Sequence, residues 1–438
     1  MGACCGKNDE FDGFMEEEEE DVEEENDIRD GDCGARVRLQ GSSRFASMFT
    51  QKGRKGINQD AMTMWEDFTG EKDMIFCGVF DGHGPSGHNV ASHVRDVLPS
   101  KLSSTFITSG LDGCNHSDVD INGYDDDNDD HDKGSHCHPS FSSWKANFIK
   151  AFKEMDEELS LDPNINCFCS GTTAVAILKQ EGHLIIANLG DSRAVLCSRG
   201  KKNQPVPDQL TVDLKPNLPG EAKRISNCRG RIFATEKEPD VFRLWLPDQN
   251  CPGLAMARAF GDFCLKDFGL IATPKISYRK LTNKDEFVVL ATDGLWDVLS
   301  NKEVVKIVAS AKKRSMAAKL LVDRAVQAWR SKYPTSKVDD CAAICLFLKV
   351  PLTKSMSNVA GGNANDQNLV VPHSSNTIRS ERDLEFLKST MTLDSKEEWS
   401  ALEGVSRVNS LVKLPRFANV MSWRKRSAKD NKDEEYYC

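Results

Sequence analysis

Apolar residues recur along the chain with two different spacings, which predict a mixture of strands and helices. Short apolar runs bounded by glycine or polar residues are typical of buried strands. They predict strands at 75–80, 173–178, 183–189, 194–197, 287–291 and 342–348. Longer stretches with apolar residues three or four positions apart predict amphipathic helices at 87–98, 142–159, 302–312 and 316–330. By itself this pattern indicates a globular domain of mixed α and β structure.

Acidic residues stand where three of the predicted strands begin or end. The first strand leads directly into Asp81-Gly82-His83-Gly84, the fifth is followed after one residue by Asp293, and Asp340 comes just before the last. These strand ends offer carboxylates, an imidazole and, at Gly82, a backbone carbonyl that no side chain covers. Oxygen donors of this kind favour hard divalent cations. The strand ends therefore indicate a metal site.

Charge is distributed unevenly along the 438 residues, whose formal net charge is −10. Residues 1–32 contain 15 acidic and 2 basic side chains, and residues 111–133 contain 9 acidic and 1 basic side chain. The rest of the chain therefore carries about +11. We expect a disordered acidic arm at 1–41, a globular domain at 42–350 with an acidic insertion loop at 111–139, and a Ser/Asn-rich linker and tail at 351–438.

Composition also bears on the cellular compartment and on two classes of site. No stretch approaches the roughly 18 apolar residues of a membrane-spanning helix, and the start lacks the apolar core of a secretory signal, so we expect an intracellular protein. The 15 cysteines show no C-x-x-C spacing, which favours reduced thiols over disulfides or a zinc site. His131, His136 and His138 lie close together in the insertion, where a solvated loop explains them better than a metal site.

Seven short motifs follow one another along the chain, at 55–61 (KGINQDA), 79–84 (VFDGHG), 170–174 (SGTTA), 188–194 (NLGDSRA), 254–262 (LAMARAFGD), 291–297 (ATDGLWD) and 339–341 (DDC). In this order they resemble the metal-dependent protein phosphatases of the type 2C family, in the form found in plants, over residues 42–350. The resemblance implies an α+β fold, a four-layer α-β-β-α sandwich of two antiparallel sheets flanked by helices. It also implies a metal site in a cleft at one end, with a flap over the cleft at 218–252.

The resemblance further implies two Mg²⁺ or Mn²⁺ ions. The ligands it implies are Asp81 as the bridge, Asp60 and the Gly82 carbonyl on one side, and Asp293 and Asp340 on the other. Asp191 matches a position that, with Asp293, holds a weaker third ion. Asp340 stands immediately before the last predicted strand and aligns better than Asp339, which remains the alternative. Two ions about 3.5–4 Å apart can clamp a phosphoryl group and lower the pKa of a bridging water, the expected nucleophile.

A histidine and a cation complete the implied site. His83 resembles the family's general acid, which protonates the leaving Ser or Thr oxygen, and its alternative role is to hydrogen-bond a metal ligand. Phosphate would be held by Lys55 or Arg54, and the family usually has Arg at the first of these positions. Two further departures are Gln59, which is Glu in the animal relatives, and Cys341, which replaces the usual Asn after the last Asp.

Three more residues of the matched region have an expected role outside the chemistry. Asp262 and Arg258 are expected to order the loop that carries the fifth motif. Trp245 lies in the predicted flap and invites comparison with a receptor-docking tryptophan of one branch of the family. Its surroundings do not match that branch, so we expect packing or substrate contact there.

We therefore expect a protein serine/threonine phosphatase that acts on phosphoprotein substrates, as a monomer and without a nucleic-acid partner. Two alternatives stay open. A catalytically weak member that serves as a binding scaffold is suggested by Lys55 and Gln59, although the complete set of metal-site Asp residues argues against it. A metal-dependent phosphohydrolase that acts on small molecules is the other.

The start of the chain is typical of an acylation signal. Gly2 is the expected myristoylation site, although Gly6 stands where the stricter motif has Ser or Thr. One myristoyl chain binds membranes with a K of only about 10⁴ M⁻¹, and the Glu run would be repelled by an anionic leaflet, so Cys4 or Cys5 is expected to carry a second acyl chain. We expect a cytoplasmic protein at the cytoplasmic face of the plasma membrane, with the nucleus as a second location. A soluble arm is the alternative.

The tail contains one short amphipathic segment. Its apolar residues recur at near-helical spacing before Pro415, at Leu402, Val405, Val408, Leu411 and Val412, and a basic cluster follows at 424–426. This pattern predicts a helix that docks on a partner or on the protein's own catalytic domain. A segment without a special role is equally compatible with the pattern.

Overall fold

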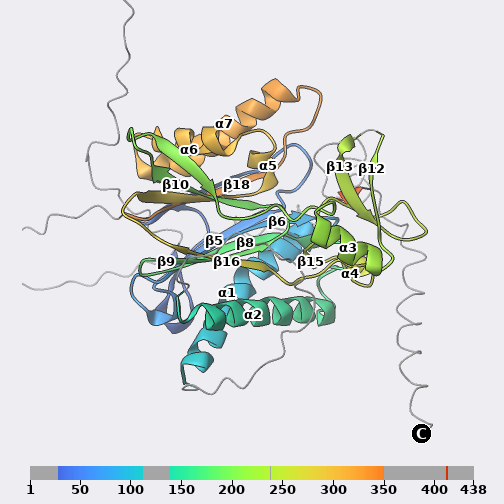
Figure 1. Ribbon diagram of the computed structural model, residues 1–438, viewed down its shortest axis with the longest axis horizontal. Coiled ribbons are helices and arrows are strands. Elements are labelled where there is room, and N and C mark those ends of the chain that lie inside the picture. The colour runs from blue at the N-terminus through green and yellow to red at the C-terminus, as the bar shows by residue number, and fades with distance from the viewer. Residues whose placement is uncertain (1–27, 112–137, 237, 350–410, 413–438) are drawn as a thin grey trace, which may run out of the picture.

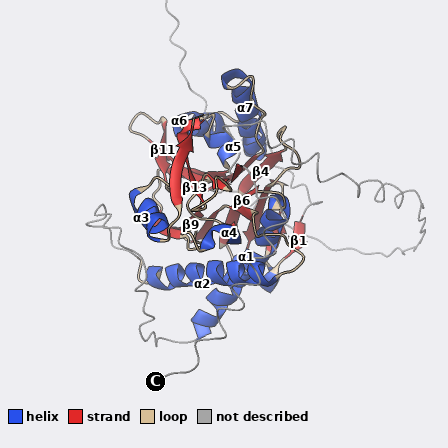
Figure 2. Ribbon diagram, turned by 90° about the vertical axis from the view of Figure 1, so that its right-hand side faces the viewer, coloured by secondary structure: helices blue, strands red, loops and turns tan. Residues whose placement is uncertain are grey.

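Two antiparallel β-sheets lie face to face in the middle of the domain, and helices cover both outer faces (Figure 1). This computed structural model describes residues 28–111, 138–236, 238–349 and 411–412. Figure 2, turned by 90°, shows the same order of layers. The fold is therefore the α+β, four-layer sandwich that the motifs implied.

The first sheet has the strand order β1-β2-β5-β6-β8-β9-β16, and the short strands β7 and β15 extend it beside β6. All of its strand pairs are antiparallel. Its strands are β1 Ile28–Asp30, β2 Arg36–Arg38, β5 Asp60–Glu66, β6 Ile75–His83, β7 Gly171–Thr172, β8 Ala174–Gln180, β9 His183–Leu189, β15 Phe260–Gly261 and β16 Lys275–Lys280.

The second sheet has the strand order β11-β10-β17-β18-β4-β3, again antiparallel. Its strands are β3 Gly41–Ser42, β4 Ala46–Gln51, β10 Arg193–Arg199, β11 Pro205–Gln209, β17 Asp285–Ala291 and β18 Cys341–Phe347. The second and third motifs thus belong to the first sheet and the last two to the second. The sandwich brings their strand ends to one edge.

The inner strands are buried on both faces, which explains why they appear in the sequence as continuous apolar runs. In β6, for example, Ile75, Cys77 and Val79 pack in the core between the sheets. Phe76 and Phe80 point the other way, into the core under the helices. Each large apolar side chain buried in this way contributes about 1.5–3 kcal/mol relative to leaving it exposed. The two cores hold β6 rigidly, and with it the polar residues at its end.

Helix pairs cover the two sheets. Helices α1 and α2 lie on the first sheet, and α6 and α7 lie on the second. The helix bounds are α1 Gly87–Leu111, α2 Phe141–Leu161, α3 Pro219–Asn227, α4 Phe263–Lys266, α5 Asp293–Trp296, α6 Asn301–Ala309 and α7 Ala317–Lys332, with 3₁₀ turns at Asp32–Gly34, Phe68–Gly70 and Arg314–Met316. A capping box fixes the start of α6, because the side chains of Ser300 and Glu303 each accept a backbone N–H of the other.

A third, small sheet stands at one end of the sandwich, in the segment predicted to form the flap (Figure 1). This flap sheet has the strand order β12-β13-β14-β19, with β12 Arg231–Thr235, β13 Glu238–Trp245, β14 Gly253–Leu254 and β19 Leu411–Val412. Trp245 is a packing residue of this sheet. Its ring stacks on Phe233 at 4.8 Å between centroids, and its Nε1 donates to the Phe233 carbonyl at 3.0 Å.

The folded region begins earlier than the predicted boundary at residue 42. Strands β1 and β2 join the first sheet through β5, so the part of the predicted disordered arm from residue 28 to 41 is ordered. The reason is a small apolar patch in an otherwise polar stretch, since Ala35 and Val37 are buried against the first core. Arg36 also pairs with Glu66 at 2.7 Å. The prediction of disorder for 1–27 lies outside the described residues.

Two other elements differ from the prediction in where they end or in their type. Helix α1 continues through Pro99 to Leu111 instead of ending near 98. The predicted tail helix at 402–412 is wrong at its end, because Leu411 and Val412 form strand β19, and the rest lies outside the described residues, as does most of the insertion loop. Tertiary contact overrides helical periodicity at this point.

The helices and the cysteines of the described residues can be compared with the expectations from composition. No helix found there combines the length and the apolar character needed to span a bilayer. The ten cysteines in the described part of the chain are all free thiols, as the absence of C-x-x-C spacing predicted.

Candidate active site

Asp60 and Asp81 face each other at the ends of two neighbouring inner strands of the first sheet. They are register partners, because Asp60 opens β5 and Asp81 lies near the end of β6. Opposed side chains on neighbouring antiparallel strands lie on the same face of the sheet and close together. Thr292, from the second sheet's side, donates its Oγ1 hydrogen to Asp60 Oδ2 at 2.9 Å. The register of β5 against β6 is therefore enough to place these two carboxylates side by side.

Asp293 reaches the same place from the second sheet. It is the first residue of α5, one residue after β17, and its charge is the largest contribution of a neighbouring residue to the raised pKa of Asp81. Gly294 permits this approach, because a Cβ atom there would overlap the carbonyl oxygen of Asp340. Gly82 is needed for a similar reason. A Cβ on Gly82 would lie 2.5 Å from the Gly87 carbonyl oxygen and 2.6 Å from that of Gln59.

Asp339 and Asp340 are adjacent in sequence but have different surroundings. The two carboxylate oxygens of Asp340 accept the backbone N–H groups of Gly53 at 2.7 Å and Gln59 at 2.9 Å. Asp339 instead pairs through Oδ1 with Lys55 Nζ at 2.5 Å, and its charge acts on both Asp60 and Asp81. Asp340 thus anchors the loop before β5 and raises the pKa of Asp60 more than Asp339 does, whereas Asp339 pairs with Lys55 and also raises the pKa of Asp81.

Lys55 and Arg54 are also adjacent in sequence and also differ in their surroundings. The Lys55 side chain is only 13% exposed and lies among the acidic residues, where burial opposes its charge but Asp339 and Asp293 together raise its pKa. Arg54 is exposed, and its backbone N–H donates to the Val338 carbonyl at 2.8 Å. Of the two cations left open by the sequence, the structure brings Lys55 to the carboxylates.

His83 has a partner that the sequence did not reveal. Its Nε2 lies 2.5 Å from Asp262 Oδ2, and both side chains are buried. Burial opposes protonation of His83, but Asp262, with smaller contributions from Asp191 and Asp293, holds its pKa above the usual value. The two residues are 179 positions apart in sequence. Their contact depends on β15, which returns the chain to β7 beside the end of β6.

Gly171 and Asp156 hold Asp262 in place. A Cβ on Gly171 would overlap Asp262 Oδ2 and would lie 2.8 Å from His83 Nε2, so only glycine leaves room for the pair. Asp156 on α2 accepts the backbone N–H of Gly261 at 2.9 Å. Asp262 itself has a positive φ of 49°, a conformation that Asp adopts more readily than most residues. The Asp262 side chain therefore positions His83, a contact beyond the loop-ordering role expected from the sequence.

Asp191 lies at the far side of the carboxylate group. It is 2% exposed, one of its oxygens pairs with Lys215, and Oδ1 has no hydrogen-bond partner among the described residues. After burial, its charge is the largest cause of the raised pKa of Asp293. Arg258, by contrast, binds both oxygens of Glu221 at 2.9 and 3.1 Å through Nε and orders α3 rather than the site.

The donor set fits hard divalent cations. Burial and then the charges of neighbouring carboxylates raise the pKa values of Asp60 and Asp81. Burial also raises the pKa of Asp339, although Lys55 opposes this, so the group of acids favours a further compensating cation. All of the ligand atoms are oxygens, as Mg²⁺ and Mn²⁺ prefer. In the described part of the chain no three His, Cys, Asp or Glu side chains converge to hold one ion unaided. Mg²⁺ commonly takes one or two carboxylates and keeps several waters, so this arrangement suits it.

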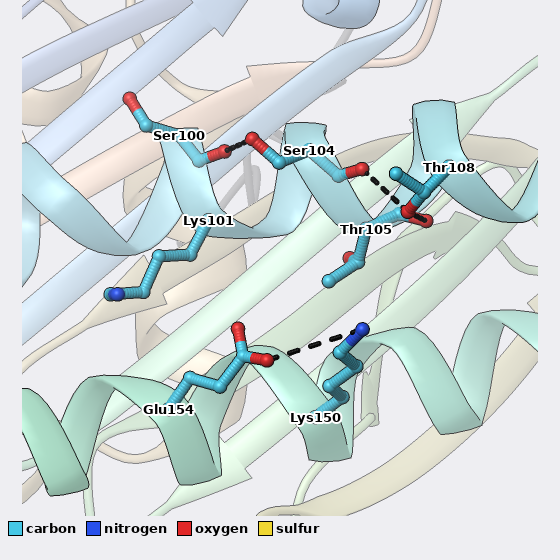
Figure 3. Close-up of a pocket in the computed structure, with 7 residues that line it drawn as sticks. All are labelled: Ser100, Lys101, Ser104, Thr105, Thr108, Lys150 and Glu154. Carbon is cyan, nitrogen blue, oxygen red and sulfur yellow. Dashed lines mark hydrogen bonds and ion pairs between the residues drawn. The ribbon is translucent and has the colours of Figure 1, made fainter.

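An open groove elsewhere on the molecule is not part of this site. It measures about 390 Å³ and lies between α1 and α2, on the helical face of the first sheet (Figure 3). Its lining residues are Ser100, Lys101, Ser104, Thr105, Thr108, Lys150 and Glu154. None of the predicted site residues is among them.

Comparison with known proteins shows the family to which the chain belongs. The family model "Protein phosphatase 2C" matches residues 47–332. The chain is 52% identical to "Probable protein phosphatase 2C 73" of rice (Oryza sativa subsp. japonica), covering 99% of both chains. It is 49% identical to "Probable protein phosphatase 2C 33" of Arabidopsis thaliana, covering 87% of this chain and 88% of that one.

A solved structure shows the same fold. The crystal structure of serine-threonine phosphatase 2C from Toxoplasma gondii superposes with a TM-score of 0.60 at 24% identity, covering 72% of this chain and 99% of that chain. The carboxylates gathered from both sheets and the matching family model lead to one conclusion. The chain belongs to the protein phosphatase 2C family, in its plant type.

Proposed function

We propose that this serine/threonine phosphatase hydrolyses phosphoserine and phosphothreonine on proteins with two Mg²⁺ or Mn²⁺ ions. The observation that carries this proposal is the meeting of Asp60 and Asp81 from one sheet with Asp293 and Asp339 from the other, beside Lys55 and the His83–Asp262 pair. When bound, two such ions activate a water nucleophile and neutralise phosphoryl oxygens. Asp81, which lies beside Asp60 of its own sheet and Asp293 of the other sheet, would be the ligand shared by the two ions, and the Gly82 carbonyl stays in the ligand set.

The contacts of Asp339 and Asp340, which lie just before β18, favour Asp339 as the metal ligand. Both Asp340 oxygens already accept backbone N–H groups, which leaves it as the anchor of the 53–59 loop. Lys55, held against Asp339, is the cation placed to meet a phosphate oxygen, as a point charge without the fork of Arg. Asp191 has one unpartnered oxygen for a third ion, although Lys215 holds the other.

His83 is the proposed general acid. Asp262 accepts from Nε2 and thereby orients the ring, while Nδ1 has no partner in the described part of the chain and is the nitrogen free to deliver a proton to the leaving oxygen. Such a group typically contributes about 10²- to 10⁴-fold to the rate. Gln59 does not need to act in the chemistry, because its Nε2 donates to the Gly84 carbonyl at 2.9 Å and so fixes the turn after His83.

Phosphate release from phosphothreonine peptides tests the function. Activity that requires Mn²⁺ or Mg²⁺ and disappears with a chelator is the expected result. Binding of phosphoproteins without turnover would indicate the scaffold alternative. Turnover of small phosphoesters alone would indicate the small-molecule phosphohydrolase.

Replacing Asp262 by Asn should lower kcat for phosphothreonine peptides by about 10- to 10²-fold, the usual range when a hydrogen-bonded partner of a key residue is lost. Asn tolerates the left-handed backbone at this position. p-Nitrophenyl phosphate, whose leaving group needs no protonation, should lose much less activity. KM values for both substrates and the melting temperature serve as controls. An equal loss for both substrates would show that Asp262 supports the fold rather than proton transfer.

We also propose attachment to the cytoplasmic face of the plasma membrane through acylation of Gly2 and of Cys4 or Cys5, all of which lie outside the described residues. Gly2→Ala should move the full-length protein from the membrane to the soluble fraction, because myristoylation requires a glycine at this position, whose α-amino group receives the first acyl chain. Gly6→Ala, which keeps Gly2, is the matched control. Equal membrane fractions for Gly2→Ala and the parent would contradict the proposal.

A further inference from the structure

Two residues of the tail form part of the flap sheet. Strand β19 pairs antiparallel with β14, with Val412 opposite Gly253 and Leu411 opposite Leu254. Figure 1 shows this segment, coloured near the red end of the bar, beside β12 and β13. In the sequence, 61 residues (350–410) separate the end of the described domain from β19. The tail can therefore dock on its own domain.

Without β19, β14 would be the edge strand of the flap sheet. Its other neighbour is β13, through the pair Leu244 and Leu254. Leu254 is fully buried and Gly253 is buried beneath the Trp245 ring. Buried backbone groups need hydrogen-bond partners, and an exposed strand edge is where an extended segment adds to a sheet. The edge of β14 is thus a place where an extended segment can add to the flap sheet.

This edge is connected closely to the active site. The Gly253 carbonyl accepts from Arg243 at 3.0 Å, and the charge of Asp191 acts on Arg243. Three residues after β14, the Ala257 N–H donates to the Leu214 carbonyl at 2.7 Å, and the Leu214 N–H donates to the carbonyl of Gly190 beside Asp191. The chain that continues from β14 is therefore hydrogen-bonded, through Leu214, to the loop that carries Asp191.

The charges of the tail and the flap are complementary. Residues 405–426 contain 6 basic and no acidic side chains. Three acidic side chains of the flap are exposed, Glu236 and Asp248 outside its strands and Asp240 in β13. The run Ser410-Leu411-Val412-Lys413-Leu414 ends at Pro415, which cannot continue a ladder. These features favour the chain's own tail as the occupant of β14.

We propose that the segment around Leu411–Val412 docks in cis as the fourth strand of the flap sheet, where it competes with extended segments of phosphoprotein substrates for the edge of β14. The second half of this statement rests on the proposed function. The tail would then restrict access of proteins, but not of small phosphoesters, to the active site.

Hydrogen exchange of the full-length protein tests the docking. Leu411→Pro removes a backbone N–H and disfavours the strand, so amide exchange in peptides covering 253–256 should become at least several-fold faster. Leu369→Pro is the matched control, the same change in the same tail but away from β19. Equal exchange rates in this region for Leu411→Pro and the parent would overturn the docking.

Kinetics test the competition. If the docked tail leaves the edge open for about a tenth to a third of the time, Leu411→Pro should lower KM for phosphopeptides by about 3- to 10-fold. KM for p-nitrophenyl phosphate and all values for Leu369→Pro should stay unchanged. Faster exchange with no change in KM would overturn the competition. A parent protein inactive on every phosphoester would instead overturn the proposed function, and the exchange measurement would still decide the docking.

Discussion

Replacing Asp81 by Asn is expected to lower phosphatase activity by at least about 10²- to 10³-fold, the loss seen when one group that stabilises transition-state charge is removed. Asp81 lies between Asp60 and Asp293, so it is the residue best placed to bridge two ions. The amide is nearly the same size but carries no charge. Residual activity should no longer respond to a chelator, and the assay is phosphate release from phosphothreonine peptides with Mn²⁺.

Thermal unfolding distinguishes a variant that no longer binds metal from one whose fold is less stable. A ligand at 100 times its Kd stabilises a protein by about 2.7 kcal/mol, so Mn²⁺ should raise the melting temperature of the parent. Without metal, Asp81→Asn should be at least as stable as the parent, because Asp81 is destabilised by burial and by neighbouring carboxylates. The response to Mn²⁺ should largely disappear. Asp323→Asn, exposed on α7, is the control, and full activity of Asp81→Asn would refute the mechanism.

Asp339→Asn and Asp340→Asn should differ in their effects on activity, on the response to Mn²⁺ and on stability. Asp339→Asn is expected to reduce activity and the stabilisation by Mn²⁺ strongly, because it removes a charge that faces Asp60, Asp81 and Lys55. In Asp340→Asn, one amide NH₂ must face the N–H of Gly53 or Gln59. An unsatisfied buried donor costs about 1–3 kcal/mol, so this variant should lose stability while it keeps its response to Mn²⁺.

The two measurements together decide the ligand. Activity, melting temperature and the Mn²⁺ shift should be compared for both variants and the parent under the same conditions. If Asp340→Asn loses the Mn²⁺ shift and Asp339→Asn keeps it, the assignment made from sequence alignment is correct and the one favoured by the surroundings is wrong.

Strand positions and much of the site could be predicted from the sequence because both depend on local features. Strands buried on two faces leave continuous apolar runs, and β9 was predicted with its observed ends. Asp60, Asp81 and Asp293 stand in short motifs at the ends of such strands. The predictions failed where a few contacts outweigh the local pattern, as at β1, β2 and β19.

The sequence by itself determined the family, the chemical type of the site and most of its carboxylates. Only the tertiary structure decided which of two adjacent residues takes which role. Lys55 differs from Arg54, and Asp339 from Asp340, in the direction of the side chain and in its neighbours, which come from other strands. The contact of His83 with Asp262 also depends on strand pairing across 179 positions. Local sequence sets which groups are available, whereas long-range packing sets which of them meet.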